Sequence, residues 1–176
     1  MAGPFAHMLV CQSAGEPGYI PPDLLQLLDK HQCFMLLGAE APDLPAIWDN
    51  VDTDGWSERF HSGPRTNSVV IAAFNDLRSQ SVADGRLAWL FGYVGHIIVD
   101  VVVHPVVHLA MQKRSGTTVH RECEMTEDSL LFKQLKSYDL KSQNFLDWLE
   151  EVTSARNRAT FDQTMRLWAS KLEQCY

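Results

Sequence analysis

Histidine and aspartate recur every four residues within one apolar stretch of the chain. The series consists of His96, Asp100, His104 and His108. On a helix each step of four residues advances only about 40°, so neighbouring members of the series share a face. An imidazole nitrogen and a carboxylate oxygen one turn apart can chelate a single divalent ion, and zinc is the first choice for such ligands. Iron and manganese accept the same ligand types.

A second pair with the same spacing, His120 and Glu124, follows on the next helical segment, and Asp128 extends its face by one turn. Facing pairs of this kind are typical of metal sites in the cores of helical bundles. A lone histidine on an apolar helix is more often an ordinary core residue. Asp100, however, is flanked by valines, and an isolated buried carboxylate is too costly unless it is paired or coordinated. The two pairs together predict a metal site.

The segment that carries the first series, residues 87–111, is long and apolar enough to invite a membrane interpretation. An aspartate at the centre of a bilayer costs about 2.5–3.5 kcal/mol, and this segment also carries three histidines. We therefore expect the central buried helix of a soluble protein and no transmembrane segment. We expect this helix to reach about His104, where Pro105 must either interrupt hydrogen bonding to Val101 or begin a new helix.

Helical periodicity continues through the other segments, and no stretch alternates as a strand does. We expect helices near residues 23–39, with Gly38 as a stop, then over 68–81, 85–104, 119–137, 145–152 and 159–174, and a loop over 40–64. The expected fold class is all-α: one compact helical domain, residues 1–176, with a polynuclear metal site between its central helices.

Composition and charge narrow the function classes. The chain has 176 residues, 45% hydrophobic and 21% charged, which is typical of a soluble globular protein. Its net charge of −7 and its few, dispersed basic residues exclude a nucleic-acid track as the main function. Four scattered cysteines without a C-x-x-C pair, and no recognisable signal peptide, favour reduced thiols and a cytoplasmic location. The oligomeric state stays open.

Ordered motifs resemble a known family, the zinc-dependent phospholipases C, which share a fold and a trinuclear zinc site with single-strand-specific zinc nucleases. The strings GHIIVDVVVHP and VHRECE resemble its H-x-x-x-D…H…H-x-x-x-E core. GPFAHMLV supplies an early histidine, LLGAEAPDLP an acidic motif and WSERFHSG a histidine after a loop. The resemblance covers about residues 1–130, whereas residues 131–176 show only helix periodicity.

The resemblance implies the following ligands, position by position. A first metal would be held by Asp43, His61, His96 and Asp100. A second would be held by His120, Glu124 and one histidine of HPVVH, for which we favour His104 over His108. A third would be held by His7 and by Asp100, which would bridge two metals. Secreted members complete the third site with an N-terminal tryptophan; no tryptophan lies near this N-terminus, where Ala2 would present the amine if Met1 is removed.

The implied activity is metal-dependent hydrolysis of a phosphoester, with two or three zinc ions and a small phosphoester or phospholipid-like substrate. Metal-bound water is acidified towards neutral pH, and Asp43 would accept its proton, orient it or serve only as a ligand. Two alternatives stay open at this point. One is an iron-dependent redox enzyme on the same helical scaffold, and the other is a non-catalytic, metal-stabilised interaction domain.

Overall fold

The computed structural model describes residues 3–14, 18, 20–44, 60, 65–111, 117–136 and 142–176. These residues are almost entirely helical and contain no strand, which confirms the all-α fold class. The helices are α1 (Pro4–Ala14), α2 (Pro22–Lys30), α3 (Gln32–Glu40), α6 (Thr66–Ser79), α7 (Gly85–Met111), α8 (Thr117–Lys136), α9 (Ser142–Thr153) and α10 (Arg158–Cys175).

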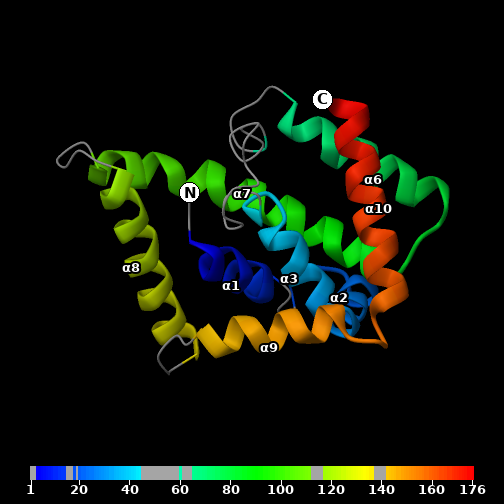
Figure 1. Cartoon of the computed structure of the whole chain (residues 1–176), viewed down its shortest axis with the longest axis horizontal. Coiled ribbons are helices and arrows are strands. Elements are labelled where there is room, and N and C mark those ends of the chain that lie inside the picture. The colour runs from blue at the N-terminus through cyan, green and yellow to red at the C-terminus, as the bar shows by residue number, and fades with distance from the viewer. Residues whose placement is uncertain are drawn as a thin grey trace.

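Helix α7 crosses the middle of the molecule, and the other helices are arranged around it (Figure 1). α1 and α3 pack on one another and on α7, and α6 and α10 pack on α7 and on each other. α8 contacts α1 and α7, while α9 contacts α3 and α10. Segments from both ends of the chain therefore meet on the central helix.

A single helix was expected over residues 23–39, but it is interrupted at His31, which separates α2 from α3. The backbone of His31 leaves the helical range (φ −118°, ψ 32°). Its carbonyl accepts hydrogen bonds from the amides of Phe34 and Met35, which starts α3 in a new direction. The expectation that Gly38 ends the helix is wrong, because Gly38 lies inside α3 and serves packing instead.

Glycine allows α3 and α7 to touch backbone to backbone. A Cβ added to Gly38 would lie 1.9 Å from the carbonyl oxygen of Trp89, and one added to Gly92 would lie 1.9 Å from that of Met35. Real side chains never approach so closely, so the crossing requires glycine on both helices. The two helices are thus held in one fixed register along their contact.

Aromatic side chains form the core beside this crossing. Phe34, Trp89 and Tyr93 are essentially inaccessible to solvent. The rings of Trp89 and Tyr93 lie 5.2 Å apart, and the ring of Trp168 on α10 lies 6.1 Å from that of Trp89. All four cysteines are free thiols, and Cys11 and Cys33 are buried. The last helix therefore contributes to the same core as α3 and α7.

Helix α7 continues through Pro105 to Met111 instead of ending at His104. Its stretch Gly85–Val103 has a mean hydropathy of 1.6 and is the one described stretch that is long and apolar enough to cross a membrane. That is weak evidence for a span, since the core helix of a soluble protein passes the same test. Ile98, Val101 and Val102 are exposed, whereas His96 and Asp100 are buried on the other side of the helix.

Replacing Gly92 with alanine is expected to lower the free energy of unfolding by about 1–3 kcal/mol, as overpacking does. The added methyl meets backbone, which cannot move aside as a side chain can. Helix propensity alone would instead favour alanine by up to about 1 kcal/mol. The measurement is chemical denaturation followed by circular dichroism.

Gly95→Ala is the matched control on the same helix, because its added Cβ meets only the sulfur of Cys11. It should cost less than Gly92→Ala. Equal or greater stability of Gly92→Ala relative to the unmodified chain would contradict the close helix crossing.

Candidate metal centre

Helix α7 presents His96 and Asp100 one turn apart on its buried face. The Nδ1 atom of His96 lies 2.6 Å from the carbonyl oxygen of Ala39, at the end of α3. A carbonyl can only accept, so Nδ1 carries the proton and donates it. The Nε2 atom of His96 is thereby directed towards Asp100, whose Oδ2 lies 3.4 Å away. A second hydrogen bond of this kind is what fixes the orientation of metal-binding histidines.

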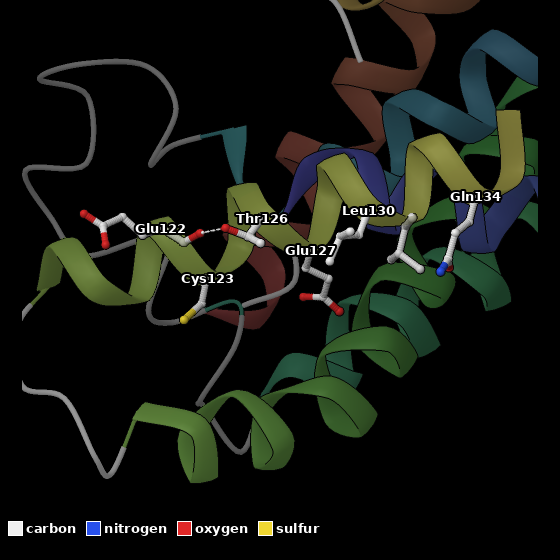
Figure 2. A pocket seen from close by; sticks show the side chains of 7 residues that line it. Glu122, Cys123, Thr126, Glu127, Leu130 and Gln134 are labelled. Carbon is white, nitrogen blue, oxygen red and sulfur yellow. Dashed lines mark hydrogen bonds between the residues drawn. The ribbon is translucent and has the colours of Figure 1, made fainter. Parts of the chain in front are cut away.

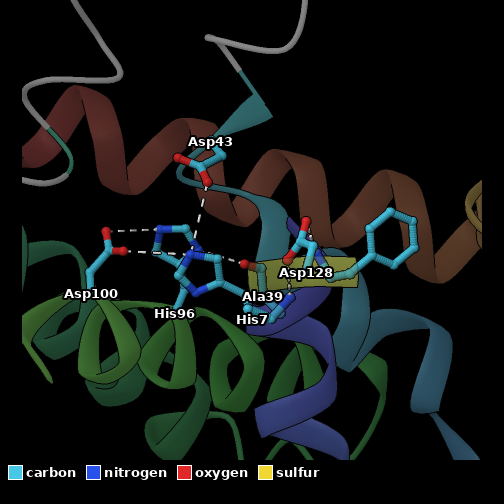
Figure 3. A network of polar contacts seen from close by, with 8 residues as sticks. His7, Ala39, Asp43, His96, Asp100 and Asp128 are labelled. Carbon is cyan, nitrogen blue, oxygen red and sulfur yellow. Dashed lines mark hydrogen bonds and ion pairs between the residues drawn. The ribbon is translucent and has the colours of Figure 1, made fainter. Parts of the chain in front are cut away.

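Two further side chains reach the same point from α1 and from the end of α3. His7 is completely buried, and its Nε2 lies 3.5 Å from Oδ1 of Asp100 and 4.0 Å from Oδ2 of Asp43. Ligand atoms of His7, Asp43 and His96 all lie within 4.8 Å of one another. Figure 3 shows these groups converging from three elements. We call His7, Asp43, His96 and Asp100 the central cluster.

The imidazole rings of His7 and His96 stack face to face, with centroids 3.8 Å apart and planes 15° from parallel. The stack holds the Nε2 atoms of both rings beside the carboxylate of Asp100, so the two imidazoles enter the site together.

The donor set fits divalent ions. Separations of 3.4–4.0 Å between nitrogen and oxygen exceed ordinary hydrogen bonds. They match the spacing of two ligands on one ion when each lies about 2.0–2.2 Å from it. The two oxygens of Asp100 face different histidines, as a carboxylate that bridges two ions would.

Asp128 of α8 is not one of the proposed ligands; its carboxylate caps the N-terminus of α1. Its carboxylate accepts hydrogen bonds from the backbone amides of Phe5, at 3.4 Å, and Ala6, at 2.8 Å (Figure 3). These bonds satisfy the Phe5 amide, one of those that the first turn of a helix leaves without a partner, and give a second acceptor to the Ala6 amide, which also donates to the carbonyl of Gly3 at 3.0 Å. The negative charge lies favourably at the positive end of the helix dipole. Gly3 leaves room for this contact, because a Cβ there would lie 2.3 Å from Asp128 Oδ2. His7 follows directly after the amides that Asp128 holds.

Glu40, the last residue of α3, is a buried carboxyl that the sequence analysis did not select. Its exposed fraction is 0%, and neither carboxyl oxygen has a hydrogen-bond partner among the described residues. Burial raises the pKa of Glu40 well above its ordinary range, and the charges of Asp43, Asp128 and Asp100 raise it further. Its position in the acidic motif LLGAEAPDLP was visible in the sequence, but its burial was not.

A groove of about 610 Å³ runs along α8 and is separate from the central cluster. Figure 2 shows its lining, which consists of Glu122, Cys123, Thr126, Glu127, Leu130, Leu131 and Gln134. Its carboxylates would repel a phosphate, and it contains none of the four side chains of the central cluster. Cys123 is therefore a groove residue, half-buried, and not part of the central cluster.

Several predicted ligands lie outside what the structure describes. His61 falls in an undescribed segment. The side chains of His104 and His108 on α7, and of His120 and Glu124 on α8, are likewise outside the described set.

Substituting Asp128 with alanine is expected to lower the free energy of unfolding by about 1–2 kcal/mol, the usual cost of losing a helix cap. It should also expose the amides of Phe5 and Ala6, so that their hydrogen exchange accelerates. Exchange measured by NMR or mass spectrometry on peptides from α1 tests this.

Gly3→Ala should have a similar effect on α1, because its methyl displaces the same carboxylate. Ser129→Ala is the control, since Ser129 is exposed and bonds only within α8. If hydrogen exchange of the α1 amides is unchanged in both the Asp128→Ala and the Gly3→Ala variant, the capping contact is excluded.

Comparison with known proteins gives one result. The model of a family described as zinc dependent phospholipase C matches residues 6–174. The match extends well beyond the 130 or so residues in which the sequence motifs were recognised. No curated protein and no solved structure matched the chain.

Proposed function

Because the chain belongs to the zinc-dependent phospholipase C family, we propose that it is a metal-dependent phosphoester hydrolase whose reaction centre is the central cluster. One observation carries the proposal. Two histidines and two carboxylates from three separate elements converge in a buried site, with spacings suited to metal ions. Such a concentration of ligand types is what a polynuclear zinc site needs.

The proposed ligand set combines described and undescribed side chains. His7, Asp43, His96 and Asp100 are supported by their mutual positions. His61, His104, His120 and Glu124 are assigned by analogy with the family motif. Helix α8 lies against both α1 and α7, as a helix contributing ligands to this site would have to. We propose two or three zinc ions per chain.

Bound zinc would acidify a water molecule and stabilise negative charge on the phosphate oxygens. The residues of the chain would position the groups that surround the metal. His96 is held by the carbonyl of Ala39, so its Nε2 stays directed into the site. Asp100 keeps the two histidines at a fixed separation, since each of its oxygens faces one of them.

Asp43 is the residue that we propose for proton transfer. Its side chain is slightly exposed at 8%, whereas that of His7 is completely buried, so Asp43 lies nearer to solvent. A carboxylate there can accept the proton of an attacking water or hold that water in line with phosphorus. Asp43 can serve as a metal ligand at the same time, because a carboxylate has two oxygens.

The proposed substrate is a small phosphoester or a phospholipid-like molecule. The family name supports a lipid-like substrate. The net charge of −7 offers no attraction for a long polyanion. Metal ions would instead concentrate positive charge at the central cluster, which suits a single phosphate group.

The test begins with the metal content of the full chain, measured by mass spectrometry after purification without added metal or chelator. Two or three zinc ions are expected. Hydrolysis of p-nitrophenyl phosphorylcholine and of phosphatidylcholine in mixed micelles is then measured, with diacylglycerol as the diagnostic lipid product. Activity should disappear on dialysis against a chelator and return with zinc.

Asp43→Asn should reduce kcat/KM by at least about 100-fold, the lower limit for losing a general base. Asp162→Asn is the matched control, because Asp162 forms only a surface pair with Arg158, 3.1 Å away. It should retain full activity. Stoichiometric zinc without any hydrolysis would favour the non-catalytic alternative, and iron as the main metal would favour redox chemistry.

A further inference from the structure

Glu40 is an unusual group to find inside a protein. Its side chain is fully buried at the end of α3, and it makes neither a hydrogen bond nor an ion pair with any described residue. An ionised carboxylate in such a place costs several kcal/mol unless a counter-charge compensates it. A protonated one still leaves its hydroxyl without an acceptor. None of the described side chains therefore balances this group.

The described surroundings of Glu40 favour a cation as its partner. The described charged groups that act on Glu40 are Asp43, Asp128 and Asp100, all of them acidic and all buried. On the α1 side its neighbour is Cys11, a thiol whose pKa is raised to about 12 by burial and then by the charge of Glu40. A protonated thiol is neutral and does not balance a carboxylate. Among the side chains that the structure describes, no basic group acts on Glu40.

The backbone places Glu40 next to residues that hold or form the central cluster. The preceding residue, Ala39, holds His96 through its carbonyl. The amide of Asp43 donates to the carbonyl of Glu40 at 3.0 Å, so one tight turn fixes both acidic residues. Glu40 thus lies between a group that orients one proposed ligand and another proposed ligand.

The charges in this region exceed what one divalent ion can balance. Asp128 is compensated by the N-terminal amides of α1, which leaves Glu40, Asp43 and Asp100. Three carboxylates together carry one more negative charge than a single zinc ion neutralises. A site that holds more than one ion accommodates all three.

We propose that Glu40 is an additional metal-binding carboxylate of this site, coordinating one of the ions through its Oε atoms. The inference rests on the proposed function, because it assumes that the site binds metal. It adds a ligand from α3 to the set that the family motif supplies. The acidic motif would then contribute two carboxylates to the centre, Glu40 and Asp43.

The test compares Glu40→Gln, Glu40→Asp and Glu150→Gln in the full chain. Glutamine keeps the shape but lacks the charge, and aspartate keeps the charge on a shorter side chain. Glu150 is an exposed glutamate on α9 and serves as the control. Each protein is freed of metal by chelator dialysis, checked for folding by circular dichroism and titrated with zinc against a chromophoric chelator.

Glu40→Gln is expected to lose one zinc ion per chain, or to bind its weakest ion at least 10–100-fold less tightly. That range is typical even for residues that only support a ligand. The metal-free variant should melt at the same or a higher temperature than the metal-free parent, since it buries no charge. Its gain in melting temperature on adding zinc should be smaller. Glu40→Asp should recover part of the affinity.

Cobalt substitution supplies a second readout. The visible absorption of the Co²⁺-loaded protein depends on the ligands of the ion, and it should change in Glu40→Gln but not in Glu150→Gln. Identical zinc affinity and an identical cobalt spectrum in Glu40→Gln would overturn the inference while leaving the proposed function intact. A parent protein that binds no metal would overturn both.

Discussion

The contact of α3 with α7 is the constraint on which the rest of the structure depends. The two helices touch through backbone at Gly38 and Gly92, so neither can slide or rotate without a clash. This contact brings the carbonyl of Ala39 to His96. It also sets where the chain leaves α3, and hence the position of Asp43. The fixed crossing of these two helices thus sets the relative positions of the side chains in the candidate metal centre.

The centre itself opposes folding when it holds no ions. Buried carboxylates lie close to one another, and burial raises the pKa of Glu40 because its charged form is so unfavourable there. The aromatic core around Trp89 and Tyr93 has to offset that cost. Metal ions that bind only the folded chain would relieve the repulsion and stabilise the protein by mass action.

Local patterns predicted most of the helices and part of the site. The spacing of His96 and Asp100 identified one buried face, and periodicity identified α7 and α8, but α1 was not predicted. The packing role of Gly38 and the burial of Glu40 depend on neighbours that are distant in the sequence, and a periodic pattern carries no information about such neighbours. The break at His31 involves local hydrogen bonds to Phe34 and Met35, which helix periodicity does not reveal. The resemblance to a family supplied His7 and Asp43, which no local spacing would have selected.

The hold of Asp128 on α1 has a consequence for the order in which the protein matures. The bond joins residues 122 positions apart, so the start of α1 cannot be capped until α8 has been synthesised. Closing so long a loop is slow compared with forming single helices. His7, the residue after the capped amides, would therefore be fixed beside His96 and Asp100 only late in folding. Loading of the proposed site with metal would then be one of the last events, and a nascent chain would carry its histidines to that point without a completed site.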